Sequence, residues 1–450
     1  MIALQDIRIE LKALIALATP LVIARLGHTA MSFVDTVMAG QIGADAVAAL
    51  ALGTTMFFFA LIPAFGTLYG VEPIVSQAVG ADDEPTWRLA IVNGRWVALA
   101  LSIPVVTVLA VSPWLLERMG QPDALLPMVR SYAWAIAPGV PAALLFALWT
   151  NVLSAHGYTR PFMYITIAAN GMNLIGNDLL IHGRFGLPEM GVAGIGLSSA
   201  LASIVELVAV LAFLHVRGEL QFIRTPWGPA DLPSLRRLLR LGLPVGVQYG
   251  LEFTSFGLAT FLMGWLGATA LAGHQIAINL VSLTFTAALG ISGAAAVRVG
   301  HAYGRRDVEG MRRAAWTAWG VGVAIGLAAA VVIVLWRDPL ARIYVDDVAT
   351  LQTATGLLLV AAVFQLADMT QCIGFGVLRG MSDTRVPVLF NLAAYWGVGL
   401  PIGAYVTFRI TQAPESLWWG LTVGLFGVAG MILLRFAANL RRVGAEWAPR

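Results

Sequence analysis

The sequence predicts an all-α polytopic membrane protein in which twelve transmembrane helices form two parallel six-helix repeats that enclose a central cavity. Three observations lead to this prediction. Of the 450 residues, 58% are hydrophobic and 12% are charged, whereas soluble proteins average about 25% charged residues. Apolar runs of roughly 20 residues, the length that crosses a bilayer, recur along the whole chain. A pattern of Pro, Gly and Ala residues also occurs twice, at a fixed separation.

The twelve apolar runs are separated by short joints that carry charges, Pro or Gly, and no run is left over for a soluble domain. In the first half we expect spans at 11–38, 46–79, 89–115, 127–151, 161–182 and 190–215. In the second half we expect them at 236–264, 268–298, 312–336, 350–376, 386–410 and 416–440. The mixed-charge N-terminus leads into an apolar segment too long for a signal-peptide core, so we expect no cleavage.

The repeat fixes the domain organisation. Pro20, Gly40, Gly43, Ala44 and Ala46 recur 224 residues later as Pro244, Gly264, Gly267, Ala268 and Ala270. Val152, Leu153, Thr159 and Arg160 recur 225 residues later as Val377, Leu378, Thr384 and Arg385. An even number of spans per half means that both copies enter the membrane in the same direction, as in transporters with parallel repeats. We therefore expect a six-helix bundle at 1–222 and a second at 223–450. Pro20 and Pro244 are then either hinges or static kinks.

Charge placement predicts the topology. Most Lys and Arg residues fall in alternate joints and in the two tails, so both termini should be cytoplasmic. The densest clusters, around Arg237 and Arg306, are most simply topology signals, and we expect no nucleic-acid partner. The single cysteine, Cys372, rules out an internal disulfide and a multi-cysteine metal site.

In the second half, two carboxylates lie inside predicted spans, where charge is expensive and usually functional. Glu252 lies in the seventh span and Asp368 in the tenth, with Gln248 and Gln365 on the same helix faces at spacings of four and three. Two acids in a low-dielectric cavity can attract a monovalent cation, or one of them can hold a proton. The alternative is that each acid pairs with a buried His or Arg for structural reasons.

The first half carries a different acidic site. Asp35 lies in the first span, and Asn173 and Asn177 lie four residues apart on one face of the fifth, with Asn170 one turn earlier. Together these groups offer a cation at least three oxygen ligands, although asparagines also join helices by hydrogen bonds. Asp178 points away from this face. Arg25 and Glu206 also lie in spans, and they either pair with each other or line the cavity.

A weaker set of residues completes the predicted cavity. Aromatic side chains near Glu252 would stack on a flat cationic substrate, and nearby polar groups would line its path. These residues are Gln248, Tyr249, Phe253, Phe256, His274, Gln275, Asn279, Phe364 and Gln365.

Three runs resemble one transporter family. VEPIVSQAVGAD (71–82), AGHQIAINL (272–280) and VLRGMSDTRVPVLFNLAAYWGVGLPIG (377–403), together with the repeated halves, resemble the multidrug and toxic compound extrusion (MATE) transporters of the NorM-like bacterial branch. The resemblance covers nearly the whole chain. It implies a V-shaped pair of six-helix bundles in the bacterial cytoplasmic membrane, and an antiporter that exports organic cations and amphiphilic drugs against inward Na⁺ or H⁺.

Residue by residue, the resemblance assigns Glu252 and Asp368 to the acids of the second bundle, and Asp35, Asn173 and Asn177 to the ion site of the first. Na⁺ is then possible at either site. In relatives, the ion site of the first bundle also includes a Thr or backbone oxygen on the sixth span, to which Ser198 and Ser199 are approximate matches. Where relatives often carry a Tyr one turn before the second acid, this chain has Phe364. The resemblance implies no cofactor beyond the coupling ion. It implies a monomer whose partners are small-molecule substrates and membrane lipid.

Three alternatives remain. A flippase for a lipid-linked saccharide would share the architecture, but should line its cavity with several basic residues, and only Arg25 lies near the middle of a span. An intramembrane serine protease is suggested by Gly290 to Gly293, which contain Ser292, with His274 and His301 as possible bases. A passive channel would not need two differently placed acidic sites. We expect a transporter and no enzymatic activity.

Overall fold

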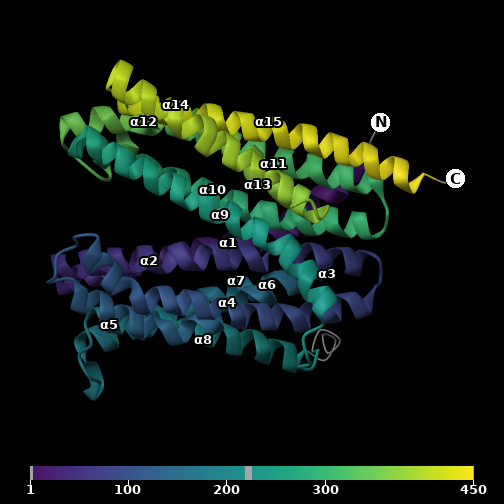
Figure 1. Ribbon diagram of the computed structural model, residues 1–450, viewed down its shortest axis with the longest axis horizontal. Coiled ribbons are helices and arrows are strands. Elements are labelled where there is room, and N and C mark those ends of the chain that lie inside the picture. Colours follow the sequence, from purple (N-terminus) through teal and green to yellow (C-terminus); the bar gives the residue numbers. More distant parts are fainter. Residues whose placement is uncertain (1–3, 218–224, 449–450) are drawn as a thin grey trace. The chain divides into compact units, whose positions relative to one another are not determined.

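The computed structural model describes residues 4–217 and 225–448, and within these ranges it contains helices and no strand (Figure 1). The first half contains α1 (Leu4–Ile42), α2 (Ala44–Leu68), α3 (Val71–Gly80), α4 (Glu84–Arg118), α5 (Leu126–Ile136), η1 (Ala137–Gly139), α6 (Val140–Ala155), α7 (Arg160–His182), η2 (Arg184–Gly186) and α8 (Val192–Val216). The second half contains α9 (Leu232–Leu266), α10 (Ala268–Gly304), α11 (Val308–Arg342), α12 (Val348–Gly380), α13 (Arg385–Asn391), η4 (Leu392–Gly399), α14 (Leu400–Val406), η5 (Thr407–Thr411) and α15 (Pro414–Trp447).

These elements confirm the twelve predicted helices. Within the described ranges, nine of the helical segments are long and apolar enough to cross a membrane. Three predicted spans are interrupted. The second breaks between α2 and α3, and the fourth has a 3₁₀ turn at Ala137–Gly139, which contains Pro138. The eleventh contains two π-helical turns, η4 and η5.

The chain divides into two compact units. Unit 1 comprises residues 1–22, 76–82 and 247–450, and unit 2 comprises residues 23–75 and 83–246. Helix α1 therefore contributes its first part to unit 1 and the rest to unit 2, and α9 changes from unit 2 to unit 1 after Gly246. The predicted boundary between residues 222 and 223 lies outside the described residues.

The backbone preserves the repeat. Gly43 and Gly267, 224 positions apart, both have positive φ angles, of 145° and 114°, and immediately precede α2 and α10. Asp82 and Arg306, also 224 apart, adopt nearly the same left-handed φ, 55° and 57°. The next residue in each copy, Asp83 or Asp307, caps the following helix by accepting a hydrogen bond from a backbone N–H. The structure thus reproduces the same turns in both halves.

Close helix crossings in each unit depend on glycine. In unit 1, a Cβ on Gly300 of α10 would collide with Ser76 of α3, and one on Gly376 of α12 with the carbonyl of Ser292. In unit 2, a Cβ on Gly66 of α2 would meet the backbone of Gly246 in α9. Small residues allow helix backbones to approach at these points, as is usual in membrane proteins.

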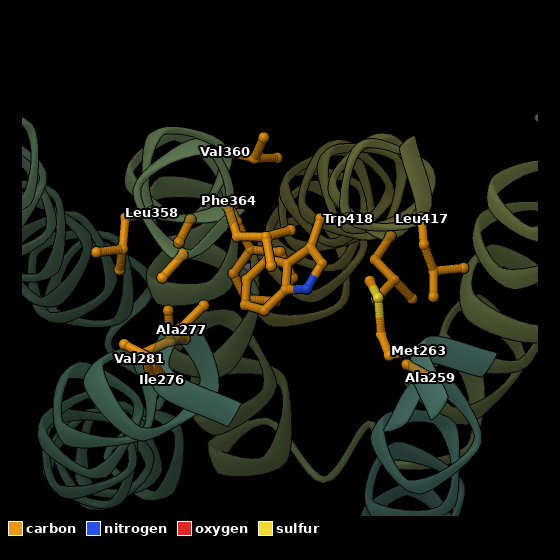
Figure 2. Close-up of a cluster of buried hydrophobic side chains, with 14 of the residues drawn as sticks. Ala259, Met263, Ile276, Ala277, Val281, Leu358, Val360, Phe364, Leu417 and Trp418 are labelled. Atoms are coloured by element: carbon orange, nitrogen blue, oxygen red, sulfur yellow. The ribbon is translucent and has the colours of Figure 1, made fainter. Parts of the chain in front are cut away.

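The apolar core of unit 1 lies between α9, α10, α12 and α15 (Figure 2). Phe364 and Trp418 lie together in this cluster, with ring centroids 5.4 Å apart. Both are fully buried, so they hold α12 against α15. This core lies next to the polar groups on α9 and α12.

Candidate ion sites in the two units

The site in unit 2 centres on the carboxylate of Asp35, which α1 places in a buried position. The side-chain amide of Asn177 donates to Oδ1 at 2.7 Å, and the hydroxyl of Ser199 donates to Oδ2 at 3.0 Å. The amide of Asn177 also reaches Oδ1 of Asn173 at 3.3 Å. Asn173 in turn donates to the hydroxyls of Ser199 and Ser198, at 3.1 and 3.4 Å. The structure therefore brings together the three residues predicted for this site, from α1 and α7, with Ser198 and Ser199 of α8, which the family resemblance had suggested as approximate matches.

Neutral donors alone bind this carboxylate. Among the described residues, no Lys, Arg or His forms an ion pair with Asp35. Oδ1 of Asn177 is buried without a hydrogen-bond partner, and a buried acceptor without a partner is unfavourable by about 1–3 kcal/mol. A proton on the carboxyl or a small cation beside it would each be compatible with these oxygens.

Asp178 lies outside this site, as its helical position predicts. It pairs with Arg184 at 3.0 Å and approaches His182 at 3.5 Å. These contacts lie at the C-terminal end of α7. Asp178 is therefore a surface acid immediately beside a buried site residue.

The site in unit 1 contains Glu252 of α9 and Asp368 of α12, both buried. Nε2 of Gln371, one turn after Asp368 on α12, lies 3.2 Å from Oε1 of Glu252. The same nitrogen lies 3.3 Å from the hydroxyl of Tyr395. Within the described part of the chain, neither acid has a cationic partner, and Asp368 accepts no side-chain hydrogen bond. The alternative that each acid pairs with a buried His or Arg is therefore wrong.

Tyr395 was not among the predicted site residues. It lies in the π-helical turn η4, and π turns occur frequently at functional sites. Phe364, one turn before Asp368, has no hydroxyl, and Tyr395 brings one to the same group of side chains from a different helix. A tyrosine in a predicted span was the available signal, but its orientation depends on the π turn.

The weaker cavity residues fall into three groups. Phe364 and His274 belong to the packed interior and are fully buried. Nδ1 of His274 accepts a hydrogen bond from Nε1 of Trp418 at 3.0 Å, so the ring is held in place. Its Nε2 lies 3.1 Å from the hydroxyl of Thr260, and both ring nitrogens are therefore occupied.

Gln248 and Gln365 complete this first, buried group, and both amide atoms of Gln365 lack a hydrogen-bond partner. Partly exposed aromatic rings form the second group, in which Phe256 packs at 6.2 Å from Tyr395. Tyr249 and Phe253 are likewise partly exposed. The third group is Gln275 and Asn279, exposed on one face of α10.

Arg25 and Glu206 have separate partners. Nη2 of Arg25 donates to the hydroxyl of Tyr69 at 2.5 Å. Glu206 accepts from the hydroxyl of Thr166 at 3.1 Å and lies 3.6 Å from Nε2 of His28. The two residues, which sequence alone could not place, therefore belong to different contacts of unit 2.

The geometry around Ser292 does not resemble a serine hydrolase site. Its hydroxyl donates to the backbone carbonyl of Cys372 at 2.6 Å, which ties α10 to α12. His274 is bonded to Trp418, as described above. These contacts give Ser292 and His274 structural roles.

Comparisons with known proteins agree with this arrangement. The MatE family model matches twice, over residues 20–179 and 244–405, and the second match begins 224 residues after the first. A probable multidrug resistance protein NorM of Bradyrhizobium diazoefficiens is 37% identical over 95% of this chain and 93% of its own length. The multidrug resistance protein MdtK of Edwardsiella ictaluri is 35% identical over 97% of both chains.

Solved structures show the same fold. The eukaryotic MATE transporter AtDTX14 superimposes with a TM-score of 0.88 at 17% identity, over 98% of this chain and 99% of that one. The bent form of the Vibrio cholerae MATE transporter VcmN gives a TM-score of 0.87 at 18% identity, with the same coverage.

Duplicated membrane helices with buried acids in both units define a polytopic membrane transporter. Within this class, the family model and the relatives identify the family. The chain belongs to the MatE family, the MATE transporters.

Proposed function

We propose that the protein is a secondary active multidrug efflux antiporter. In this proposal it exports organic cations and amphiphilic drugs in exchange for inward Na⁺ or H⁺, by alternating access of its two halves, 1–222 and 223–450. Its place is the bacterial cytoplasmic membrane, as a monomer surrounded by lipid with both termini in the cytoplasm. The names of the NorM and MdtK relatives support multidrug export, and the basic alternate joints support the topology.

The observation that carries the proposal is the environment of Glu252 and Asp368. Both acids are buried within unit 1, and neither has a cationic partner among the described residues. Isolated charge in a membrane protein interior is strongly unfavourable. A proton, a sodium ion or the cationic substrate would remove that cost. Because the ion and the substrate would not occupy the site together, entry of the ion would be coupled to exit of the drug.

Asp35 supplies a second site of different chemistry. Its carboxylate is surrounded by amide and hydroxyl groups, whose oxygens are suitable ligands for Na⁺ and whose N–H and O–H groups stabilise negative charge. We propose that Asp35, Asn173 and Asn177 bind the coupling ion, and that Glu252 and Asp368 exchange an ion or proton for the substrate. No other cofactor enters this mechanism.

Efflux of ethidium from proteoliposomes tests the proposal, with an imposed sodium gradient and an imposed pH gradient applied separately. We expect wild type to respond to at least one gradient, and Glu252→Gln, Asp368→Asn and Asp35→Asn to reduce that response by about tenfold or more. Asp178→Asn is the matched control, because it neutralises a partly exposed acid next to Asn177. Correctly inserted wild-type protein that ignores both gradients would refute the antiport mechanism.

A further inference from the structure

Besides Asp35, unit 2 contains the buried acid Glu206, which the proposed mechanism does not use. Glu206 lies in the interior of α8, with only 3% of the residue exposed. Its oxygen Oε1 accepts from the hydroxyl of Thr166 on α7 at 3.1 Å and lies 3.6 Å from Nε2 of His28 on α1. An ionisable residue in a membrane-spanning helix is by default a candidate functional group.

The same three helices build this contact and the Asp35 site. Two turns of helix separate the sites, because each helix contributes one residue to each at a spacing of seven. The pairs are His28 and Asp35 on α1, Thr166 and Asn173 on α7, and Glu206 and Ser199 on α8. Seven residues correspond to about 10 Å along a helix. The two acids therefore lie at different heights along the line where α1, α7 and α8 meet, which we call the seam of unit 2.

Polar groups also occupy the seam between the two sites. The side-chain amide of Asn170 donates to the carbonyl of Gly27 at 2.8 Å. Its Oδ1 is buried without a hydrogen-bond partner. Ser203, one turn from Glu206 on α8, donates to the carbonyl of Ser199 at 3.1 Å. The seam is thus polar along its length inside otherwise apolar helices.

The repeat shows that this contact is specific to the first half. The residue 224 positions after His28 is Glu252, and the residue 225 positions after Glu206, the separation that holds at Val152 to Arg160, is Met431. The second half thus has an acid, Glu252, on the first helix of the repeat. At the matching position the first half has His28, and its acid, Glu206, lies on α8 instead. A purely architectural contact would not require this exchange of ionisable groups.

We propose that His28 and Glu206 together hold one exchangeable proton, as a second proton-binding station of unit 2. The side chain of His28 is 48% exposed, so the imidazole opens onto the surface of unit 2, and the proposal requires that water reaches it there. The proton then resides on Nε2 as part of an ion pair with Glu206, or on the carboxyl itself, and it leaves by the same route. No other bond forms or breaks.

The surrounding charges are consistent with a proton as the ligand. Arg25 lies one turn before His28 on α1 and donates to Tyr69, and Asp35 lies two turns after it. On α8 the nearest other titratable group is His215, more than two turns away, and on α7 Thr166 contributes a neutral hydroxyl. An imidazole nitrogen 3.6 Å from the carboxylate occupies a side that a sodium ion would need for oxygen ligands.

Infrared difference spectroscopy of the protein in liposomes tests this station without transport. The background is the double variant Glu252→Gln with Asp368→Asn, which removes the signals of the two buried site carboxyls of unit 1. Between about pH 5 and pH 9 we expect a protonated-carboxyl band that Glu206→Gln abolishes and Asp35→Asn retains. His28→Gln should move its midpoint by about one pH unit, a tenfold change in proton affinity.

The half-exposed position of His28 makes His28→Gln a variant that should fold even if Glu206→Gln does not. A midpoint unchanged in folded His28→Gln, or a full band persisting in folded Glu206→Gln, would overturn the station. The inference rests on the proposed function only for its use in transport. If the Glu206 band titrates as expected but wild-type protein shows no gradient-driven efflux, the station stands and the antiporter is refuted. If wild type shows gradient-driven efflux but the band does not titrate as expected, the antiporter stands and the station is refuted.

Discussion

Asn177 donates its side-chain amide to Asp35 at 2.7 Å, and this contact joins α7 to α1 in unit 2. Ser199 adds a second donor from α8. In unit 1 the situation differs, since Gln371 is the one described residue that donates to Glu252 through its side chain. Unit 2 thus holds Asp35 in a formed network, whereas the two site acids of unit 1 have unused acceptor capacity.

Asn177→Leu should destabilise unit 2, because it removes a hydrogen bond to a carboxylate. Such bonds contribute about 1.5–3 kcal/mol. Thermal unfolding in detergent should show a lower melting temperature for this variant. Ser203→Ala is the control, since its hydroxyl bonds to the carbonyl of its own helix at Ser199. Equal melting temperatures for the two variants would contradict a stabilising role of the Asn177 contact.

Tyr395→Phe should weaken ion binding in unit 1 while preserving the fold. The ring would keep its packing against Phe256, but Gln371 would lose the hydroxyl at 3.3 Å. A neutral hydrogen bond is worth about 0.5–1.5 kcal/mol, so the ion concentration for half-maximal efflux should rise several-fold. The exposed Tyr405 provides the control variant Tyr405→Phe. A rise of the same size in both variants would show that the hydroxyl of Tyr395 has no specific role.

The sequence was sufficient for features that depend on local periodicity. The twelve helices follow from apolar runs, and Asn173 and Asn177 fall on one face of α7 because they are four residues apart. Tyr395 escaped prediction because η4 changes the helical register by a π turn. His274 and Phe364 were assigned to the cavity from their proximity in sequence to other candidates, but contacts with Trp418 bury them in the core.

Other features depend on which helices become neighbours. The pairing of His28 with Glu206 requires α1, α7 and α8 to meet, and no spacing in the sequence encodes that meeting. The division of α1 after Val22 and of α9 after Gly246 is also a property of tertiary packing. It places part of each repeat's first helix in the unit formed mainly by the other repeat.

Gly376→Ala should destabilise unit 1 through a backbone clash. The added Cβ would collide with the carbonyl oxygen of Ser292 where α12 crosses α10, and overpacking of this kind typically costs about 1–3 kcal/mol. Gly257→Ala, on α9, has no atom within 4 Å of the added Cβ. That control should be neutral or slightly stabilising, since alanine favours helices over glycine by roughly 0.5–1 kcal/mol. Unfolding measurements that rank the two variants in the opposite order would contradict the close crossing.

Asp347 should make the stability of α12 depend on pH. Its carboxylate caps the helix by accepting hydrogen bonds from the backbone N–H and the hydroxyl of Thr350, at 2.9 and 2.8 Å. These bonds lower the pKa of Asp347 below its ordinary value. The folded protein therefore binds this proton more weakly than the unfolded chain, so the cap stabilises the fold above the unfolded pKa and loses its effect as the pH falls through the folded pKa.

We expect Asp347→Ala to lower the melting temperature at pH 7, and the difference from wild type to shrink at about pH 3, where the carboxyl becomes protonated. Asp346→Ala removes the adjacent exposed acid, for which no capping bond occurs among the described residues. Its effect should be small at both pH values. A destabilisation by Asp347→Ala that stays constant down to low pH would mean that the cap works through its neutral carboxyl, and that the charge of Asp347 contributes nothing to the helix end.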